Sequence, residues 1–139
     1  MDYYLCNVCG TVFDGRMIKE NEYLYTSECP ISSCCGDIFQ CDEEMLVPIS
    51  ILNRKGYITD FCCSGHIYNT NSGGGYISFF EGCSPDCEPP KGWYKDNSVR
   101  PVIRYDLKGH DYIKRLKERH RKIDALVKWC EELEEAEEI

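Results

Sequence analysis

The chain has 139 residues, a length at which one hydrophobic core is sufficient, so the sequence predicts a small protein rather than a long assembly of domains. Its 24 acidic and 16 basic residues give a formal net charge of -8. This sign disfavours binding to phosphate backbones, because nonspecific affinity for nucleic acids comes mainly from Lys and Arg. It suits a basic protein surface better.

Eleven cysteines raise the question of the redox compartment. The N-terminal residues contain neither the basic nor the apolar segment of a signal peptide, and no apolar run approaches the roughly 20 residues that cross a bilayer. We therefore expect a cytoplasmic location with a reducing environment. Paired cysteines there are metal ligands more often than disulfides.

Residues 1–41 are expected to form an N-terminal four-cysteine zinc ribbon. Short β-prone pieces at residues 3–5, 12–13 and 23–25 accompany two cysteine-containing turns. A ribbon of this kind buries little apolar surface, so Zn²⁺ must supply folding free energy of about 10 kcal/mol or more.

We predict that Cys6, Cys9, Cys29 and Cys34 bind one Zn²⁺ tetrahedrally. Cys34 is preferred to Cys35 because its wider turn opens with a proline and closes with a glycine, which leaves Cys35 to point into the core. Four thiolates saturate the ion and leave no position for a water, so the predicted role is structural. The alternative is that these thiols are ordinary buried cysteines or disulfides.

Residues 42–139 are expected to form a small mixed β-sheet domain with one short helix and a long C-terminal helix, which makes the chain α+β. Asp42 is a candidate N-cap for a helix that ends at Lys55, and Gly56 is its stop signal. Pro48 complicates this helix, which either starts nearer Val47 or kinks at the proline.

The rest of this unit combines strands with one long helix. Strands are predicted at residues 57–63, 76–80 and 101–105, the last as an edge strand because it contains a proline. A glycine-rich loop, 64–75, and an irregular segment, 81–99, connect them. A helix over 111–135 has an apolar stripe for packing on the sheet or on a second copy of the chain, and its acidic end is expected to fray.

The turn Cys63-Ser64-Gly65-His66 allows three roles. Cys63, Ser64 and His66 are candidates for a nucleophile and base, although no acidic residue can be assigned to orient the base and residues this close in sequence rarely form a working pair. The amides of Ser64 to His66, with the glycine-rich loop, are candidates for a phosphate- or carboxylate-binding nest. The third role is a purely structural tight turn.

The helix, strand and turn over residues 48–80 resemble the wybutosine-biosynthesis methyltransferase family of transfer-RNA modification. That family has a Tyr-x-Thr strand followed by a Ser-Cys-Ser-Gly-Arg turn, and the matching positions here are Tyr57, Thr59, Cys63, Ser64 and Gly65. His66 stands where the family has arginine. The resemblance implies an S-adenosylmethionine-dependent RNA-modifying enzyme. Our candidate ligand-binding residues are Thr59, Cys63, Ser64, Gly65 and His66.

Over a longer stretch, from Cys29 to about Tyr105, the chain is similar to a group of small bacteriophage and mobile-element proteins. In these a CP-type zinc knuckle precedes an LNxKGYxT segment and a CCSGH turn, all of which this sequence contains. The resemblance implies a phage-type binding protein in the host cytoplasm. Its expected partner is a host defence protein that it inhibits, or a small anionic ligand such as a nucleotide signal.

Two further features have alternative interpretations. Cys83 and Cys87 are free surface thiols, or form a second zinc site with Cys62 or Cys63 and His66. The basic stretch 114–122 is a solvated helix face, or the nucleic-acid-binding surface of a ribbon protein. Our leading interpretation is a zinc-binding, non-enzymatic binding protein. The alternatives are the RNA-modifying enzyme and the nucleic-acid-binding ribbon.

Overall fold

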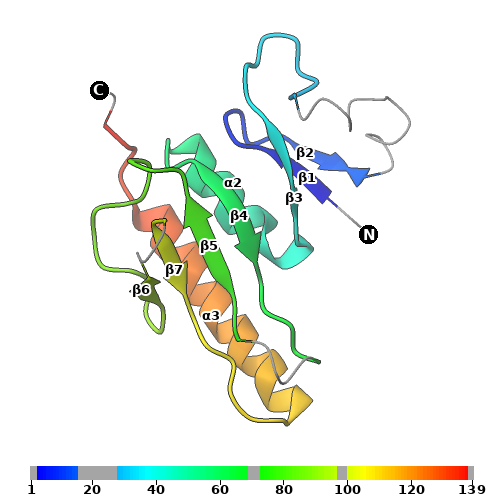
Figure 1. Ribbon diagram of the computed structural model, residues 1–139, viewed down its shortest axis with the longest axis vertical. Helices are drawn as coiled ribbons and strands as arrows, with labels where there is room; N and C mark the ends of the chain where they lie inside the picture. Colours follow the sequence, from blue (N-terminus) through cyan, green and yellow to red (C-terminus); the bar gives the residue numbers. More distant parts are fainter. Residues whose placement is uncertain (1–2, 16–27, 69–72, 97–99, 138–139) are drawn as a thin grey trace.

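The computed structural model describes residues 3–15, 28–68, 73–96 and 100–137. The described chain is α+β, as predicted, with a three-stranded sheet, a four-stranded sheet and a long helix near the C-terminus (Figure 1). The strand predicted at 23–25 lies outside the described residues. No described helix is both long and apolar enough to cross a membrane.

The first sheet brings the two cysteine turns together. Its central strand β1 (Tyr3–Cys6) pairs antiparallel with β2 (Val12–Asp14) on one side and with β3 (Ile38–Cys41) on the other. Strand β3 was not predicted, because it is short and contains the polar Gln40. Its register places Ile38 opposite Cys6, so the turn before β3 lies next to the turn after β1.

The second sheet has the order β4-β5-β7-β6, and every neighbouring pair is antiparallel. Its strands are β4 (Thr59–Cys63), β5 (Tyr76–Phe79), β6 (Tyr94–Asp96) and β7 (Val102–Arg104). The prediction of an edge strand at 101–105 was wrong. Pro101 precedes the strand, so β7 keeps its amides for pairing, and the unpredicted three-residue β6 forms the edge.

The first helical segment consists of the 3-10 helix η2 (Glu43–Met45) and the α-helix α2 (Leu46–Arg54). Pro48 is the third residue of α2, in the first turn, where amides have no partner within the helix and a proline is tolerated. Asp42 was wrongly predicted as a side-chain cap, since its carboxylate makes no capping hydrogen bond. It is used elsewhere, as described below.

The LNxKGYxT segment, residues 52–59, forms the end of α2 and leads into β4. Gly56 has a φ of 94°, and the amides of Gly56 and Tyr57 donate to the carbonyls of Asn53 and Leu52, which is a Schellman motif. The buried Asn53 side chain then donates to Thr59 Oγ1 at 2.9 Å and accepts from the Thr59 amide at 2.9 Å. Asn, Gly and Thr in this segment therefore join a helix to a strand.

Helix α3 (Tyr112–Glu132) begins at Asp111, whose carboxylate accepts from the amides of Ile113 and Lys114. It lies with α2 on one face of the second sheet (Figure 1). The predicted apolar stripe is only partly correct, since Ile113 is 62% exposed. The buried residues of α3 are Arg115, Leu126 and Cys130.

The acidic end of α3 is bound rather than frayed. Lys55 Nζ donates to the carbonyls of Cys130 and Glu131, both at 2.9 Å. Beyond the last helical residue, the Ala136 amide donates to the Lys55 carbonyl at 2.7 Å, and Tyr57 Oη donates to the Glu134 carbonyl at 2.7 Å. A lysine at the negative end of the helix dipole offsets the acidic side chains nearby.

Both sheets contribute to the main hydrophobic core. Leu5 and Cys41 from the first sheet pack in the same cluster as Ile77 and Phe79 from β5. The carbonyl of Gly10, in the first cysteine turn, also accepts a hydrogen bond from Ser50 Oγ in α2 at 3.2 Å. The described residues before position 42 thus pack directly on those that follow it.

We expect Asn53→Ala to lower the free energy of unfolding by about 2–4 kcal/mol, because it leaves the amide and hydroxyl of Thr59 without partners in the core. Thr59→Val is the matched control. It keeps the amide bond to Asn53 and should cost clearly less. Urea unfolding monitored by circular dichroism measures both, and equal losses would contradict the role assigned to Asn53.

Candidate functional site

The structure brings together the four cysteines predicted as ligands. The sulfurs of Cys6, Cys9, Cys29 and Cys34 all lie within 4.8 Å of one another. The distance from Cys6 Sγ to Cys34 Sγ is 3.6 Å, and that from Cys9 Sγ to Cys29 Sγ is 3.8 Å. A tetrahedron with Zn–S bonds of 2.3 Å has S–S edges of about 3.8 Å. The four sulfurs therefore can hold a metal ion, and their spacing fits Zn²⁺.

Backbone amides around the cluster are oriented for thiolates. Val8 N lies 3.3 Å from Cys6 Sγ, and Gly36 N lies 3.4 Å from Cys34 Sγ. Such N–H···S contacts orient metal-bound sulfurs and stabilise their charge. Gly36 is required by space as well, because a Cβ atom there would collide with Cys6 Sγ.

The thiols of the cluster differ in acidity. Burial and the neighbouring cysteines raise the pKa of Cys29 to about 12. Burial acts in the same direction on Cys9, but hydrogen bonds from the side chain and backbone of Thr11 outweigh it and lower the pKa to about 6. A metal ion must therefore displace the proton of Cys29 at neutral pH, so metal affinity should fall as the pH is lowered.

Cys35 does not point into the core as predicted but is exposed. Cys34 turns its sulfur toward the cluster, so the next residue along the chain faces solvent. A second metal site also fails to assemble from the described residues, among which only Cys6, Cys9, Cys29 and Cys34 bring their ligand atoms close enough together to hold an ion. Cys83 and Cys87 line a groove beside Tyr57, away from the turn that follows β4.

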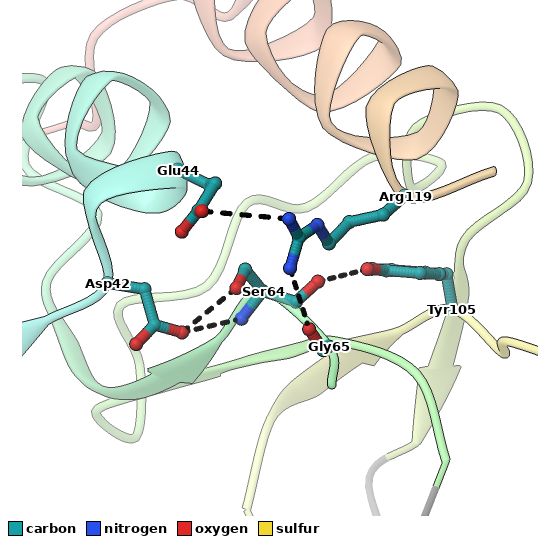
Figure 2. Close-up of polar contacts among 6 residues, drawn as sticks. All are labelled: Asp42, Glu44, Ser64, Gly65, Tyr105 and Arg119. Atoms are coloured by element: carbon teal, nitrogen blue, oxygen red, sulfur yellow. Dashed lines mark hydrogen bonds and ion pairs between the residues drawn. The ribbon is translucent and has the colours of Figure 1, made fainter. Parts of the chain in front are cut away.

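The Ser64–His66 turn, residues 64–66, binds a carboxylate of the protein itself, whereas the sequence predicted that it binds an anionic ligand. Figure 2 shows Asp42 Oδ2 accepting hydrogen bonds from both the amide and the hydroxyl of Ser64, each at 3.0 Å. The amide predicted to bind phosphate or carboxylate therefore already has a carboxylate partner. Asp42 precedes η2, and its position 22 residues before Ser64 gave no sign of this contact.

The carbonyls of the same turn are also occupied. Tyr105 Oη donates to the Ser64 carbonyl, and Arg119 Nη1 donates to that of Gly65 at 3.2 Å (Figure 2). Arg115 Nη2 donates to the His66 carbonyl at 3.0 Å. Two of these donors, Arg115 and Arg119, lie in α3, and the third, Tyr105, directly follows β7. This supports the structural interpretation of the turn.

Arg115 is the anchor of this region. It is 1% exposed, and its guanidinium donates to four carbonyls, those of His66, Ile67, Leu107 and Gly109, at 3.0–3.1 Å. Two loops are thereby held to one helix. Sequence analysis missed this residue, because it lies in a basic stretch that was interpreted as a solvated or nucleic-acid-binding face.

A groove of about 660 Å³ lies beside the turn, and three of the predicted ligand residues line it: Ser64, Gly65 and His66. Its charged residues are Asp42, Glu44 and Arg119, and Arg119 Nη2 lies 3.7 Å from Glu44 Oε1 (Figure 2). The groove thus has two carboxylates for one guanidinium, and an excess of negative charge disfavours an anion.

The other two predicted ligand residues lie outside that groove. Thr59 is fully buried against Asn53. Cys63 Sγ lies 3.4 Å from His66 Nε2, which is close enough for a thiol–imidazole pair. Burial, however, raises the pKa of Cys63, whereas a nucleophilic cysteine requires a lowered one.

A second groove, of about 980 Å³, was not predicted. It runs between residues 82–88 and the end of α3 with the segment that follows it, and Tyr57 and Trp129 contribute aromatic rings to its wall. Its charged lining residues are all acidic, namely Asp86, Glu88, Glu132, Glu134, Glu135 and Glu137. We call it the acidic groove. The only sequence signal for it was the run of glutamates, which was expected to fray.

Comparison with protein-family models, curated proteins and solved structures finds no match for this chain. The two resemblances given above therefore rest on the quoted residues alone.

We expect Cys29→Ser to lose bound zinc, from about one ion per chain to almost none, because a serine hydroxyl does not ionise to replace the thiolate. Cys35→Ser is the matched control and should keep its metal. Elemental analysis of the purified variants measures this. Retention of zinc by Cys29→Ser, or its loss in both variants, would contradict the assigned ligand set.

We expect Arg115→Met to lower the free energy of unfolding by about 3 kcal/mol or more, because buried carbonyls in two loops lose their donor. Arg121→Met is the control on the same helix. The Arg121 side chain is 71% exposed, and its loss should change stability by no more than about 0.5 kcal/mol. Chemical denaturation compares the two, and a small effect at Arg115 would refute its anchoring role.

Proposed function

We propose that this chain is a zinc-stabilised, non-enzymatic binding protein that holds a basic segment of a partner protein in the acidic groove. The observation that carries the proposal is the charge of that groove, whose charged lining residues are all carboxylates. Such a surface attracts Lys- and Arg-rich segments and repels phosphates. The net charge of -8 acts in the same direction.

The aromatic wall adds a second kind of recognition. Trp129 Nε1 donates to the Glu88 carbonyl at 2.9 Å, and Tyr57 Oη is bound to the Glu134 carbonyl. Both rings are thus fixed in place by their polar atoms. A guanidinium or ammonium group that enters the groove can stack on such a ring while it pairs with a carboxylate. Arginine is the better fit to this combination.

The metal cluster has a supporting role in this proposal. Four sulfurs complete the tetrahedral coordination of Zn²⁺ and leave no position for a substrate. The cluster instead orders the first sheet, whose Leu5 and Cys41 belong to the core on which the groove residues Tyr57, Trp129 and Leu133 pack. Zinc is therefore proposed as a structural cofactor.

The similarity to phage and mobile-element proteins favours a host protein as the partner, with inhibition of a host defence component as the outcome. The expected partner was either a host defence protein or a nucleotide signal. We propose that it is the protein. The carboxylate of Asp42 occupies the Ser64 amide, and the groove beside it carries more negative than positive charge.

The two alternatives gain less from the structure. Thr59 and Ser64, which belong to the methyltransferase-like pattern, both make internal hydrogen bonds. Of the basic stretch on α3, Arg115 is buried and Arg119 is turned to Gly65. Lys122 Nζ lies 3.3 Å from a Glu118 carboxylate oxygen. These contacts leave less positive charge for nucleic acid than the sequence implied.

We expect the purified protein to bind a fluorescein-labelled synthetic peptide rich in arginine, with an affinity that falls as salt is added. Reversing charge with Glu134→Lys and Glu137→Lys together should weaken binding by about tenfold or more. Fluorescence anisotropy measures both effects.

The matched control is the pair Glu43→Lys and Asp124→Lys, two exposed acidic residues outside the groove. It changes the net charge by the same amount and should weaken binding much less. Equal weakening by both pairs would show that only net charge matters and would refute the acidic groove as the site. An absence of binding by the unmodified protein would do the same.

A further inference from the structure

Two cysteines outside the metal cluster face each other where the two sheets meet. Cys41 is the last residue of β3 and Cys62 lies in β4, and their sulfurs are 3.7 Å apart. Cys41 is 3% exposed, whereas Cys62 is only partly buried. Neither belongs to the group of sulfurs that can hold a metal ion.

We propose that Cys41 and Cys62 form a disulfide site, which a hydroperoxide oxidises and which covalently joins the first sheet to the second. A disulfide has an S–S bond of about 2.05 Å, so the two sulfurs must move closer together from their present separation of 3.7 Å. Their strands already pack side by side, because β3 and β4 are in contact.

The two thiols differ in access, which sets the order of the steps. A peroxide from solvent reaches the partly buried Cys62 before the buried Cys41. The hydrogen bond with Cys62, together with burial, raises the pKa of the Cys41 thiol. Cys41 therefore keeps its proton until Cys62 has reacted, and acts as the resolving thiol.

Each step balances. The Cys62 thiolate attacks one peroxide oxygen, the O–O bond breaks, and Cys62 becomes a sulfenic acid while hydroxide takes up the proton lost by the thiol and leaves as water. Cys41 sulfur then attacks Cys62 sulfur, the S–S bond forms, the S–O bond breaks, and the departing hydroxyl leaves as water with the proton of Cys41. Two thiols are oxidised, and one hydrogen peroxide is reduced to two waters.

The neighbouring thiol is not an equal competitor. Cys63 follows Cys62 directly, but successive side chains of a strand point to opposite faces. Its sulfur lies 3.4 Å from the imidazole of His66 rather than beside Cys41. The structure thus selects the partner that is distant in sequence.

The test uses the full chain loaded with zinc and treated with hydrogen peroxide, followed by alkylation of the remaining thiols, digestion without reductant and mass spectrometry. We expect a peptide pair linked through Cys41 and Cys62, lighter than the two free peptides by two hydrogen atoms, in most of the protein and before zinc is released. Dithiothreitol should restore both thiols.

Two variants keep the proposal falsifiable. Cys62→Ser alters a partly buried side chain and should abolish the linked pair, whereas Cys35→Ser, which removes an exposed thiol, should leave its yield unchanged. The proposal is overturned if Cys62 is found linked to Cys63 or to another cysteine, or if Cys62 is oxidised beyond the sulfenic acid while Cys41 still alkylates. It is also overturned if the link forms only after zinc has been lost.

Discussion

The buried guanidinium of Arg115 is the constraint on which the two loops beside the second sheet depend. A charge that is 1% exposed is costly unless each of its donors finds an acceptor. Here two loops place four backbone carbonyls around the guanidinium, and these carbonyls accept its hydrogen bonds. The Ser64–His66 turn takes its shape from this requirement, and Asp42 and Arg119 complete it from opposite sides (Figure 2). The loops are therefore arranged by an internal cation rather than by a ligand.

The predictable parts of the fold were those whose signal is local. The cysteine ligands were found because each pair lies on one short turn, and Gly56 was found because a helix stop depends on a few adjacent residues. The failures concern contacts between distant residues. Nothing near Asp42 in sequence indicates that it will bind Ser64, and nothing in the apolar stripe of α3 predicts a buried arginine. Strands β3 and β6 were missed because short, polar strands acquire their pairing from neighbours that the sequence does not identify.

The dense motifs of this chain contribute little to the groove that we propose as its binding surface. The LNxKGYxT segment and the CCSGH turn, which carried both family resemblances, are used for bonds within the protein. Asn53, Lys55 and Tyr57 donate to backbone carbonyls, and Asp42 binds the amide and hydroxyl of Ser64. The acidic groove, in contrast, takes only Gly56 and Tyr57 from these motifs, and its carboxylates belong to no recognisable pattern. Its glutamates lie in a tail that Lys55 and Tyr57 hold in place. A surface that binds by charge needs only several residues of one charge that lie close together in the fold, and this requirement produces no sequence motif.

The separation of Arg115 from the cysteine cluster has a consequence for how the chain folds during synthesis. All four metal ligands precede residue 35, so the cluster can close around its ion while α3 has yet to be made. The strands of the second sheet are made next, but their loops lack the cation that arranges them until α3 arrives. During synthesis the metal ligands are therefore available first, and the contacts of Arg115 can form only once α3 has been made. In the interval between them, the newly made strands have no helix α3 covering their apolar face, which is when a chaperone would be of most use.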